Sequence, residues 1–368
     1  MTYQLSTLRR NLQLLNVIHC ITTISRGGAE NQLLILAREQ VKNGRNVSVV
    51  FLKGDPELKS EFVKVGANVI EILTNKSIIH QIIILKKYLQ NKKVIIHAHL
   101  PRAELVASLA CGNNKLIVSR HNTEQFFPKA PKILSRTLSI FVTHRAAKCI
   151  AISEAVKDFL LLEREVFTKD KISIVYYGYD NKNVSVSIKK QNRLNFTIGN
   201  IGRLVAQKDQ KTLLLAFAEF LEYYSLSKLI IIGVGELKSD LQKLARELCI
   251  DESIVWIDRT NDVEKYMNEM DLFVLTSKYE GFGMVLLEAI QNNLPILASN
   301  NSAIPEVLGT EYIGLFETSN HLDLLSKMLK YCRNPQQFDT SDFYQNAMLK
   351  FDPIKMSNSL DRIYNMLE

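Results

Sequence analysis

The sequence predicts an α/β fold made of two doubly wound parallel-sheet domains. Short apolar segments rich in β-branched residues alternate with segments whose apolar residues recur at the helical period. This alternation indicates parallel strands with helices on both faces. It runs through the first half of the chain, stops over a polar stretch near residues 180–194 and then starts again. A length of 368 residues is sufficient for two such domains.

The strands and helices can be placed along the chain from this pattern. In the first half, strands are predicted at 14–21, 46–52, 94–98, 116–119 and 149–152, with a helix over 29–43. In the second half, the strands are 195–201, 229–233, 255–258, 272–276 and 296–299, and the helices are 209–224, 236–248 and 285–291. We therefore expect an N-terminal domain over 1–182, a linker over 183–194 and a C-terminal domain over 195–345. A last helix, within 346–368, is expected to pack back on the N-terminal domain.

Composition excludes several classes of protein. Hydrophobic residues are 46% and charged residues 23% of the chain, which is ordinary for a globular protein. No apolar run approaches the roughly 18 residues of a membrane span, so we expect a soluble, cytoplasmic protein. Five scattered cysteines, none in a C-x-x-C pair, favour neither a disulfide framework nor a zinc site.

The net charge of +8 is unevenly distributed. Residues 1–180 hold 26 Lys and Arg against 14 Asp and Glu, whereas the remainder holds 20 against 24. A basic half indicates an anionic partner, for which nucleic acid and an anionic membrane surface are both candidates.

The segment 271–291 carries the clearest chemical pattern. A strand leads into a loop containing Glu280, Gly281 and Gly283, and a helix containing Glu288 follows. Glycines let the backbone approach a ligand closely, and the start of a helix favours a phosphate. Both carboxylates can point into one cleft and accept hydrogen bonds from sugar hydroxyls. Since Glu288 has apolar neighbours on both sides, it fits a solvated helix face poorly, and we interpret it as a ligand-binding residue.

Two cations and a glycine pair follow other predicted strands. Arg203 and Lys208 lie five residues apart just after a strand, where they can stabilise the charge that develops on a departing diphosphate. The sequence has no Asp-x-Asp motif, so this cationic pair is favoured over a metal ion for that task. Gly27-Gly28 stands at the first strand-to-helix junction and predicts a second approach to a phosphate or sugar.

In this order along the chain, these segments resemble family 4 of the retaining glycosyltransferases, which have two Rossmann-like domains facing across a central cleft (the GT-B fold). The stretch from Glu280 to Glu288 is similar to the family's Glu-x7-Glu signature. The other similar segments are Gly27-Gly-Ala-Glu30, Ala151-Ile-Ser-Glu154, Val175-Tyr-Tyr-Gly-Tyr-Asp180 and Gly199-Asn-Ile-Gly-Arg-Leu204 with Lys208. The chain departs from the pattern at Ser302-Ala-Ile304, where a glycine pair is common, and at Asp258-Arg-Thr260, which lacks the usual glycine.

The resemblance implies a role for each candidate residue. The implied catalytic residues are Glu280, His99, Arg203 and Lys208, with Glu280 on the donor sugar and Glu288 on the ribose. The implied donor-binding residues are Gly27, Gly28, Arg203, Lys208, Glu280, Gly281, Phe282, Gly283, Met284, Val285 and Glu288. His121 and Asn122 are implied on the acceptor side, and neither a metal nor a cofactor is implied.

Two histidines can also be interpreted without the family. His97 and His99 end a predicted strand and share one face, because side chains in a strand alternate. Two histidines without a carboxylate make a poor metal site. A structural, hydrogen-bonded imidazole is the alternative for both, more so for His97.

The expected function is transfer of a sugar from a nucleotide donor, favoured to be a UDP-sugar, to a lipid-linked or polysaccharide acceptor in cell-surface glycan synthesis. GDP-mannose as donor, a soluble acceptor and a nucleotide-sugar 2-epimerase of the same fold are the alternatives. A nucleic-acid-binding role explains the basic half but not the glutamates and glycine loops.

The expected location is the inner face of the cytoplasmic membrane, through contact with anionic lipid. Two segments combine apolar and basic residues, 77–93 and 126–132. We interpret the first as a core helix with a solvated basic end. The second contains Phe126 and Phe127 in a loop with prolines, where both rings are hard to bury, and is interpreted as the contact.

Overall fold

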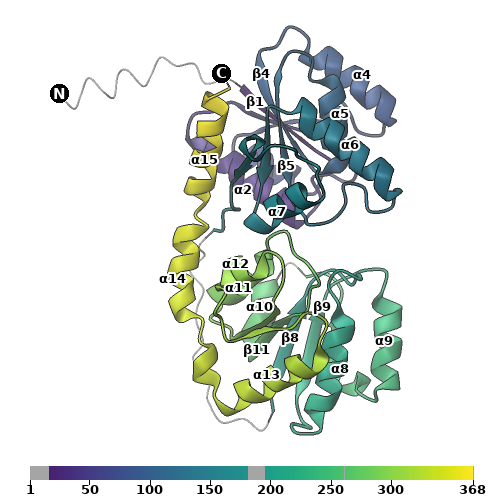
Figure 1. Ribbon diagram of the computed structural model, residues 1–368, viewed down its shortest axis with the longest axis vertical. Helices are drawn as coiled ribbons and strands as arrows, with labels where there is room; N and C mark the ends of the chain where they lie inside the picture. The colour runs from purple at the N-terminus through teal and green to yellow at the C-terminus, as the bar shows by residue number, and fades with distance from the viewer. Residues whose placement is uncertain (1–15, 181–194, 261, 368) are drawn as a thin grey trace, which may run out of the picture. The chain divides into compact units, whose positions relative to one another are not determined.

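The computed structural model describes residues 16–180, 195–260 and 262–367 (Figure 1). These residues divide into two compact units, the first formed by 16–180 together with 351–367, and the second by the described residues between 195 and 350. Each unit is a parallel sheet covered by helices, which confirms the predicted fold class of two Rossmann-like domains. The expected linker over 183–194 lies outside the described residues.

The first unit contains a seven-stranded parallel sheet of order β3-β2-β1-β4-β5-β6-β7. Its strands are β1 (Asn16–Ile21), β2 (Val47–Phe51), β3 (Asn68–Ile70), β4 (Val94–His99), β5 (Lys115–Arg120), β6 (Lys148–Ala151) and β7 (Ile172–Ile174). Its helices are α2 (Gly28–Lys42), α3 (Lys59–Lys64), α4 (Ile78–Leu89), α5 (Pro101–Ala110), α6 (Lys132–Arg145), α7 (Glu154–Leu162) and α15 (Pro353–Asn365). The order of the strands reverses between β1 and β4, and ligands of open α/β sheets bind at such a switch point.

The second unit repeats this plan with six parallel strands of order β10-β9-β8-β11-β12-β13. The strands are β8 (Thr197–Ile201), β9 (Lys228–Ile232), β10 (Ile254–Ile257), β11 (Leu272–Leu275), β12 (Ile296–Ser299) and β13 (Leu315–Phe316). The helices are α8 (Gln210–Leu221), α9 (Lys238–Glu247), α10 (Val263–Glu269), α11 (Met284–Gln291), α12 (Ile304–Leu308), α13 (His321–Arg333) and α14 (Ser341–Lys350). Here the switch point lies between β8 and β11, the two strands that precede the loops of Arg203 and Glu280.

Each core follows from the apolar pattern of the sequence. In the second unit, α8 buries Leu213, Phe217 and Phe220 completely or nearly so, and they pack in one cluster with Leu324 and Met328 of α13. Burial of side chains of this size contributes about 1.5–3 kcal/mol each. The two helices and the sheet beneath them therefore form the rigid base on which the loops at the switch point stand.

The chain returns to the first unit through α15, which packs beside α2 (Figure 1). The side chain of Arg45 is fully buried there, and its Nε lies 2.5 Å from Asp361 Oδ1 of α15. Arg45 also donates to Asn365 at 2.6 Å and lies over the ring of Tyr364. Because losing one partner of a buried ion pair costs about 3–5 kcal/mol, this contact holds α15 firmly in the first unit.

Within the described residues, no helix is both long enough and apolar enough to cross a membrane.

Candidate functional site

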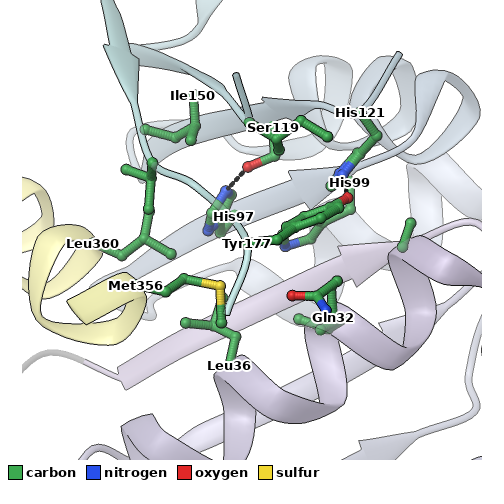
Figure 2. Close-up of a pocket in the computed structure, with 14 residues that line it drawn as sticks. Gln32, Leu36, His97, His99, Ser119, His121, Ile150, Tyr177, Met356 and Leu360 are labelled. Atoms are coloured by element: carbon green, nitrogen blue, oxygen red, sulfur yellow. Dashed lines mark hydrogen bonds between the residues drawn. The ribbon is translucent and has the colours of Figure 1, made fainter. Parts of the chain in front are cut away.

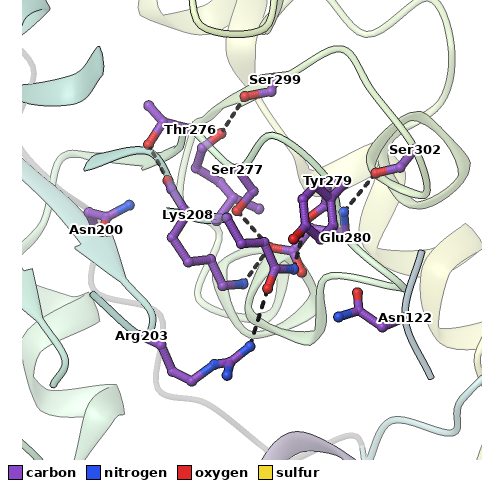
Figure 3. Close-up of polar contacts among 12 residues, drawn as sticks. Asn122, Asn200, Arg203, Lys208, Thr276, Ser277, Tyr279, Glu280, Ser299 and Ser302 are labelled. Carbon is purple, nitrogen blue, oxygen red and sulfur yellow. Dashed lines mark hydrogen bonds and ion pairs between the residues drawn. The ribbon is translucent and has the colours of Figure 1, made fainter. Parts of the chain in front are cut away.

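The second unit brings together two of the predicted site residues, Lys208 and Glu280 (Figure 3). The Lys208 ammonium forms an ion pair with Glu280 Oε1, and the two side chains are only 14% and 8% exposed. Ser277 donates a second hydrogen bond to the same carboxylate oxygen at 2.6 Å. The Thr276 hydroxyl donates to the backbone carbonyl of Lys208 at 2.9 Å, which ties the loop after β8 to the loop after β11. The cation expected on a diphosphate and the carboxylate expected on a sugar are therefore direct neighbours.

Arg203 follows β8, as Lys208 does, and is more exposed than Lys208. Its guanidinium donates to Gln207 Oε1 at 3.2 Å, and the amide of Gln207 donates to the backbone carbonyl of Tyr279 at 2.9 Å. Arg203, Lys208 and Glu280 together carry one net positive charge. Such a group suits an anionic ligand that also offers hydroxyl groups.

Two glycines that the sequence analysis did not single out shape the loop of Arg203. A Cβ on Gly233 would lie 1.9 Å from the carbonyl oxygen of Gly202, and one on Gly235 would lie 2.1 Å from that of Leu204. Main-chain hydrogen bonds, such as Leu204 N to Val234 O at 2.9 Å, join the two loops. The visible signal was the pattern Gly-x-Gly directly after a buried strand, which marks close backbone approach.

Ser302 stands where the related pattern has glycine, and it contacts Glu280. The Ser302 hydroxyl accepts a hydrogen bond from the backbone N–H of Glu280 at 2.7 Å. The backbone of Ser302 is left-handed, with φ of +48°, a conformation that favours glycine. Ser302 thus takes a backbone conformation that glycine adopts easily, and its hydroxyl adds a contact to the loop of Glu280.

The rest of the predicted donor-binding segment surrounds the start of α11. Gly281, Phe282 and Gly283 are buried, and Gly283 has a φ of +86° just before the helix. Met284, Val285 and Glu288 are half-buried on the helix itself. A helix start carries partial positive charge, so this loop adds to the attraction that Arg203 and Lys208 exert on an anion.

In the first unit, His99 is the last residue of β4 and lies near His97 of the same strand (Figure 2). Both belong to a group of buried histidines that also includes His19 of the neighbouring strand β1. His19 Nδ1 lies 3.0 Å from His99 Nε2, and the rings of His97 and His99 are 4.2 Å apart. Burial lowers the pKa of His19 to about 4 and holds the pKa values of His97 and His99 well below the ordinary value. All three imidazoles are therefore neutral at pH 7.

Among the described residues, these three histidines are also the candidate site for a metal ion. One nitrogen from each of His19, His97 and His99 lies within 4.8 Å of the others. Both nitrogens of His97 are already within hydrogen-bond distance of hydroxyls, those of Tyr364 at 2.6 Å and Ser119 at 2.7 Å. A metal would have to displace one of these partners, so the donor set fits a hydrogen-bonded network better than a metal centre.

The predicted glycine loop, Gly27-Gly28, begins α2. Gly27 precedes the helix with extended backbone, and a Cβ on Gly28 would meet nothing within 4 Å, so this position is open. The carboxylate of Glu30, however, lies close to Gly27, where it accepts a hydrogen bond from Thr23 at 2.7 Å. A phosphate would have to displace this carboxylate, whereas a sugar hydroxyl could donate to it.

His121 and Asn122 follow β5. The Tyr177 hydroxyl contacts His121 Nδ1, and His121 Nε2 is buried with no hydrogen-bond partner among the described residues. Burial, together with the nearby Arg120 charge, lowers the pKa of His121 to about 3. Asn122 is half-buried and accepts a hydrogen bond from the backbone N–H of Thr123 at 3.1 Å.

A buried ion cluster fixes the start of this loop. Arg120 Nε lies 2.8 Å from Glu104 Oε2, and its Nη1 lies 2.9 Å from Glu165 Oε2, with all three side chains at most 7% exposed. Burial raises the pKa of Glu104 to about 7. The same guanidinium stacks on Phe126, with its Cζ 4.3 Å from the ring centre.

The stacking corrects one expectation from the sequence. Phe126 is only 2% exposed, and Phe127 is half-buried beside it. The prediction that both rings are hard to bury was wrong for Phe126, because the apolar ring covers the buried guanidinium. This loop therefore offers little apolar surface.

Two family models match the chain. The model described as Glycosyltransferase Family 4 matches residues 26–183, and the model described as Glycosyl transferases group 1 matches residues 182–347. Together they span most of the chain and follow the order of the two units. The chain belongs to this glycosyltransferase family.

Relatives of this glycosyltransferase include other proteins named as glycosyltransferases. An uncharacterized glycosyltransferase of Haemophilus influenzae is 27% identical over 85% of this chain and 89% of its own. The UDP-Gal:alpha-D-GlcNAc-diphosphoundecaprenol alpha-1,3-galactosyltransferase of Escherichia coli is 25% identical over 76% and 79%. The match to an uncharacterized glycosyltransferase of Methanocaldococcus jannaschii spans about half of each protein, 47% of both.

The fold of the glycosyltransferase is also that of solved structures. Anabaena HepE, solved in complex with UDP-glucose, matches with a TM-score of 0.80 at 19% identity, over 96% of this chain and 100% of that one. This likeness concerns the fold, which is the GT-B fold expected from the resemblance.

The raised pKa of Glu104 predicts a specific dependence of stability on pH. Between about pH 4.5 and 7 the folded protein retains the Glu104 proton that the unfolded chain releases, so Glu104 makes the protein less stable as pH rises through this window. Glu104→Gln should remove this contribution. The free energy of unfolding of the variant, relative to that of the wild type, should therefore be higher at pH 8 than at pH 5. Urea unfolding followed by circular dichroism between pH 5 and 8 measures it. Exposed Glu154→Gln is the control, and a Glu104→Gln curve parallel to that of the wild type would contradict the assignment.

Proposed function

We propose that this protein is a retaining glycosyltransferase that moves a hexosyl group from a nucleotide sugar to a lipid-linked or polysaccharide acceptor. The observation that carries the proposal is the buried pair of Lys208 and Glu280 beside Arg203. A nucleotide sugar offers the two chemical groups that such a site can bind, a diphosphate for the cations and sugar hydroxyls for the carboxylate.

The roles divide between the two units. Arg203 and Lys208 neutralise the diphosphate, Glu280 accepts hydrogen bonds from the donor sugar, and Glu288 accepts them from the ribose. In the first unit, His99 contacts the donor sugar, while His121 and Asn122 bind the acceptor. The assignment in the first unit is supported by the position of these residues at the carboxyl ends of β4 and β5.

The reaction is a substitution at the anomeric carbon. The acceptor hydroxyl oxygen forms the new glycosidic bond on the same face from which the diphosphate departs, and the bond between the anomeric carbon and the diphosphate oxygen breaks. The electron pair of that bond stays on the diphosphate, which takes up the proton of the acceptor hydroxyl. Arg203 and Lys208 lower the barrier because the negative charge that they contact grows during this step. With two cations in this role, the transfer needs neither a metal ion nor a cofactor.

Donor and acceptor classes are proposed from the relatives. UDP is the favoured nucleotide because HepE was solved with UDP-glucose and the E. coli relative is a UDP-Gal transferase. A lipid-linked diphosphate saccharide is the favoured acceptor, since the name of that E. coli protein includes a diphosphoundecaprenol acceptor.

If the donor is a UDP-sugar, UDP and UDP-sugars should stabilise the protein against thermal unfolding. A ligand that binds only the folded state, at a hundred times its Kd, contributes about 2.7 kcal/mol, or a Tm rise of roughly 3–4 °C at this chain length. UDP and UDP-sugars should raise the Tm, and Arg203→Ala and Glu288→Ala should reduce the rise.

Two variants of exposed residues on α9, Arg246→Ala and Glu247→Ala, serve as matched controls that retain the rise. Absence of a shift with every nucleoside diphosphate and nucleotide sugar would contradict the transferase proposal. Conversion of the donor sugar without any acceptor would instead identify an epimerase.

A lipid-linked acceptor places the enzyme at the inner face of the cytoplasmic membrane, and α4 offers a surface for contact with anionic lipid. Ile79 and Ile83 are 65% and 58% exposed, although the segment was interpreted from the sequence as a core helix. Lys86 and Lys87 are exposed on the same face, because residues three, four and seven apart align on a helix. Exposed apolar side chains beside lysines are typical of interfacial helices.

The membrane proposal predicts binding to anionic vesicles that weakens about tenfold between 50 and 500 mM salt, since salt screens the lysines. Ile79→Ser with Ile83→Ser should weaken binding at every salt concentration, whereas Lys86→Glu with Lys87→Glu should remove the salt dependence. Leu226→Ser, an exposed apolar residue of the second unit, is the control. Co-sedimentation with vesicles measures the effect, and absent or salt-insensitive binding would contradict the contact.

A further inference from the structure

A chain of buried hydrogen bonds links His99 to the returning helix α15. It passes through six side chains that are at most 4% exposed, in the order His99, His19, Gln40, Tyr364, His97 and Ser119. The successive distances are 3.0, 2.8, 3.4, 2.6 and 2.7 Å. The last of these, from His97 to Ser119, is drawn in Figure 2. Four elements of the first unit other than β4 contribute to the chain, namely β1, β5, α2 and α15.

Gln40 gives this chain a direction. Its carbonyl oxygen faces His19 Nε2, and its amide nitrogen faces the Tyr364 hydroxyl. A carbonyl only accepts hydrogen bonds, so His19 must carry its proton on Nε2. Because burial keeps His19 neutral, its Nδ1 has no proton and accepts one hydrogen bond.

The two halves of the chain follow from this step. His99 Nε2 is the neighbour of His19 Nδ1, so His99 must donate from Nε2 and its own Nδ1 is unprotonated. On the other side, the Gln40 amide donates to Tyr364, the phenol donates to His97 Nδ1, and His97 Nε2 donates to Ser119. Turning the Gln40 amide by 180° would reverse every one of these bonds and place all three protons on Nδ1.

We propose that Gln40 and Tyr364 are positioning residues that hold His99 as its Nε2–H tautomer, with Nδ1 ready to accept a hydrogen bond from a substrate hydroxyl. The hydroxyl belongs to the donor sugar, and this part rests on the proposed function. His99 lines a cavity of about 20 Å³ together with His97, His121 and Tyr177, which is room for about one water-sized group. A fixed acceptor there selects a hydroxyl donor and disfavours another acceptor.

The tautomer can be measured without any substrate. In protein labelled with ¹⁵N-histidine, long-range ¹H–¹⁵N correlation spectra distinguish Nε2–H from Nδ1–H rings. The proposal expects His19, His97 and His99 all as Nε2–H at pH 7.5, with His121 assigned through His121→Gln. Nδ1–H signals for His19 and His99 would overturn the proposal, because they would show that the hydrogen bonds run in the opposite direction, with the Gln40 amide turned by 180°.

Variants then test whether the chain sets the tautomer. Gln40→Met removes both hydrogen bonds of the amide and should leave His99 as a mixture of tautomers. Tyr364→Phe keeps the ring under Arg45 and should alter His97 first. Asn43→Ala is the matched control, since Asn43 donates hydrogen bonds to Ser357 and Asp361 of α15 but takes no part in the series of hydrogen bonds that leads to His99. An unchanged Nε2–H signal of His99 in Gln40→Met would also overturn the proposal.

Activity separates this proposal from the proposed function. Gln40→Met should lower kcat about tenfold, the effect of one hydrogen bond, while the Kd for the nucleoside diphosphate stays unchanged because Lys208 and Arg203 bind it. Asn43→Ala should keep the wild-type kcat. An equal kcat for Gln40→Met and the wild type would overturn the positioning role. Failure of the wild type to bind any nucleotide sugar would instead overturn the proposed function and leave the tautomer result intact.

Discussion

The buried ion pair between Lys208 and Glu280 is the constraint on which the site of the second unit depends. Two charges taken out of water are costly unless each finds further partners. The carboxylate has one, in the hydroxyl of Ser277, and the loop of Lys208 is held by Thr276 through its backbone carbonyl. Gln207 and Ser302 hold the backbone of Tyr279 and Glu280 in place, because Gln207 donates to the carbonyl of Tyr279 and Ser302 accepts from the N–H of Glu280. A diphosphate and a sugar hydroxyl would give the ammonium and the carboxylate additional partners, which explains why the pair stands at the switch point of the sheet.

The corresponding edge of the first unit is built on the opposite principle. The polar side chains of β1 and β4 there, His19, His97 and His99, are neutral imidazoles rather than charged groups, because burial lowers their pKa values. Neutral groups form directional hydrogen bonds but bring no net charge to the site. This edge therefore suits recognition of hydroxyl groups, while the second unit suits an anion. The buried Arg120 cluster lies one residue before His121 and gives the adjoining loop a rigid start.

Much of this arrangement could be predicted from the sequence, for physical reasons that are visible in particular segments. The alternation of apolar strands and helices gave the fold class, because parallel strands buried on both faces are continuous apolar runs. β11 and β12 match their predicted segments closely. β3, β7 and β13 were missed because segments of two or three residues carry no periodic signal. Lys208 and Glu280 were predicted to share a site, but their direct pairing was not.

The missed residues share one cause, which is that their partners are distant in the sequence. His19 stood inside an apolar strand, where a polar residue signals a buried partner, yet its partners Gln40 and His99 come from α2 and β4. Tyr364 is 267 residues beyond His97 in the sequence, and the two side chains meet only because α15 returns to the first unit. Phe126 was predicted to be exposed because its partner, the guanidinium of Arg120, could not be identified from the pattern of the loop.

The most direct test of the central claim is a double-mutant cycle at Lys208 and Glu280, measured by isothermal titration calorimetry with UDP and with a UDP-sugar. Lys208→Met should weaken both ligands by about tenfold or more, since it removes a charge on the diphosphate. Glu280→Gln should weaken the UDP-sugar and leave UDP unchanged, and the double variant should lose less than the two single losses together because the residues are coupled. Wild-type affinity in both single variants, or equal weakening of UDP and UDP-sugar in Glu280→Gln, would contradict the account.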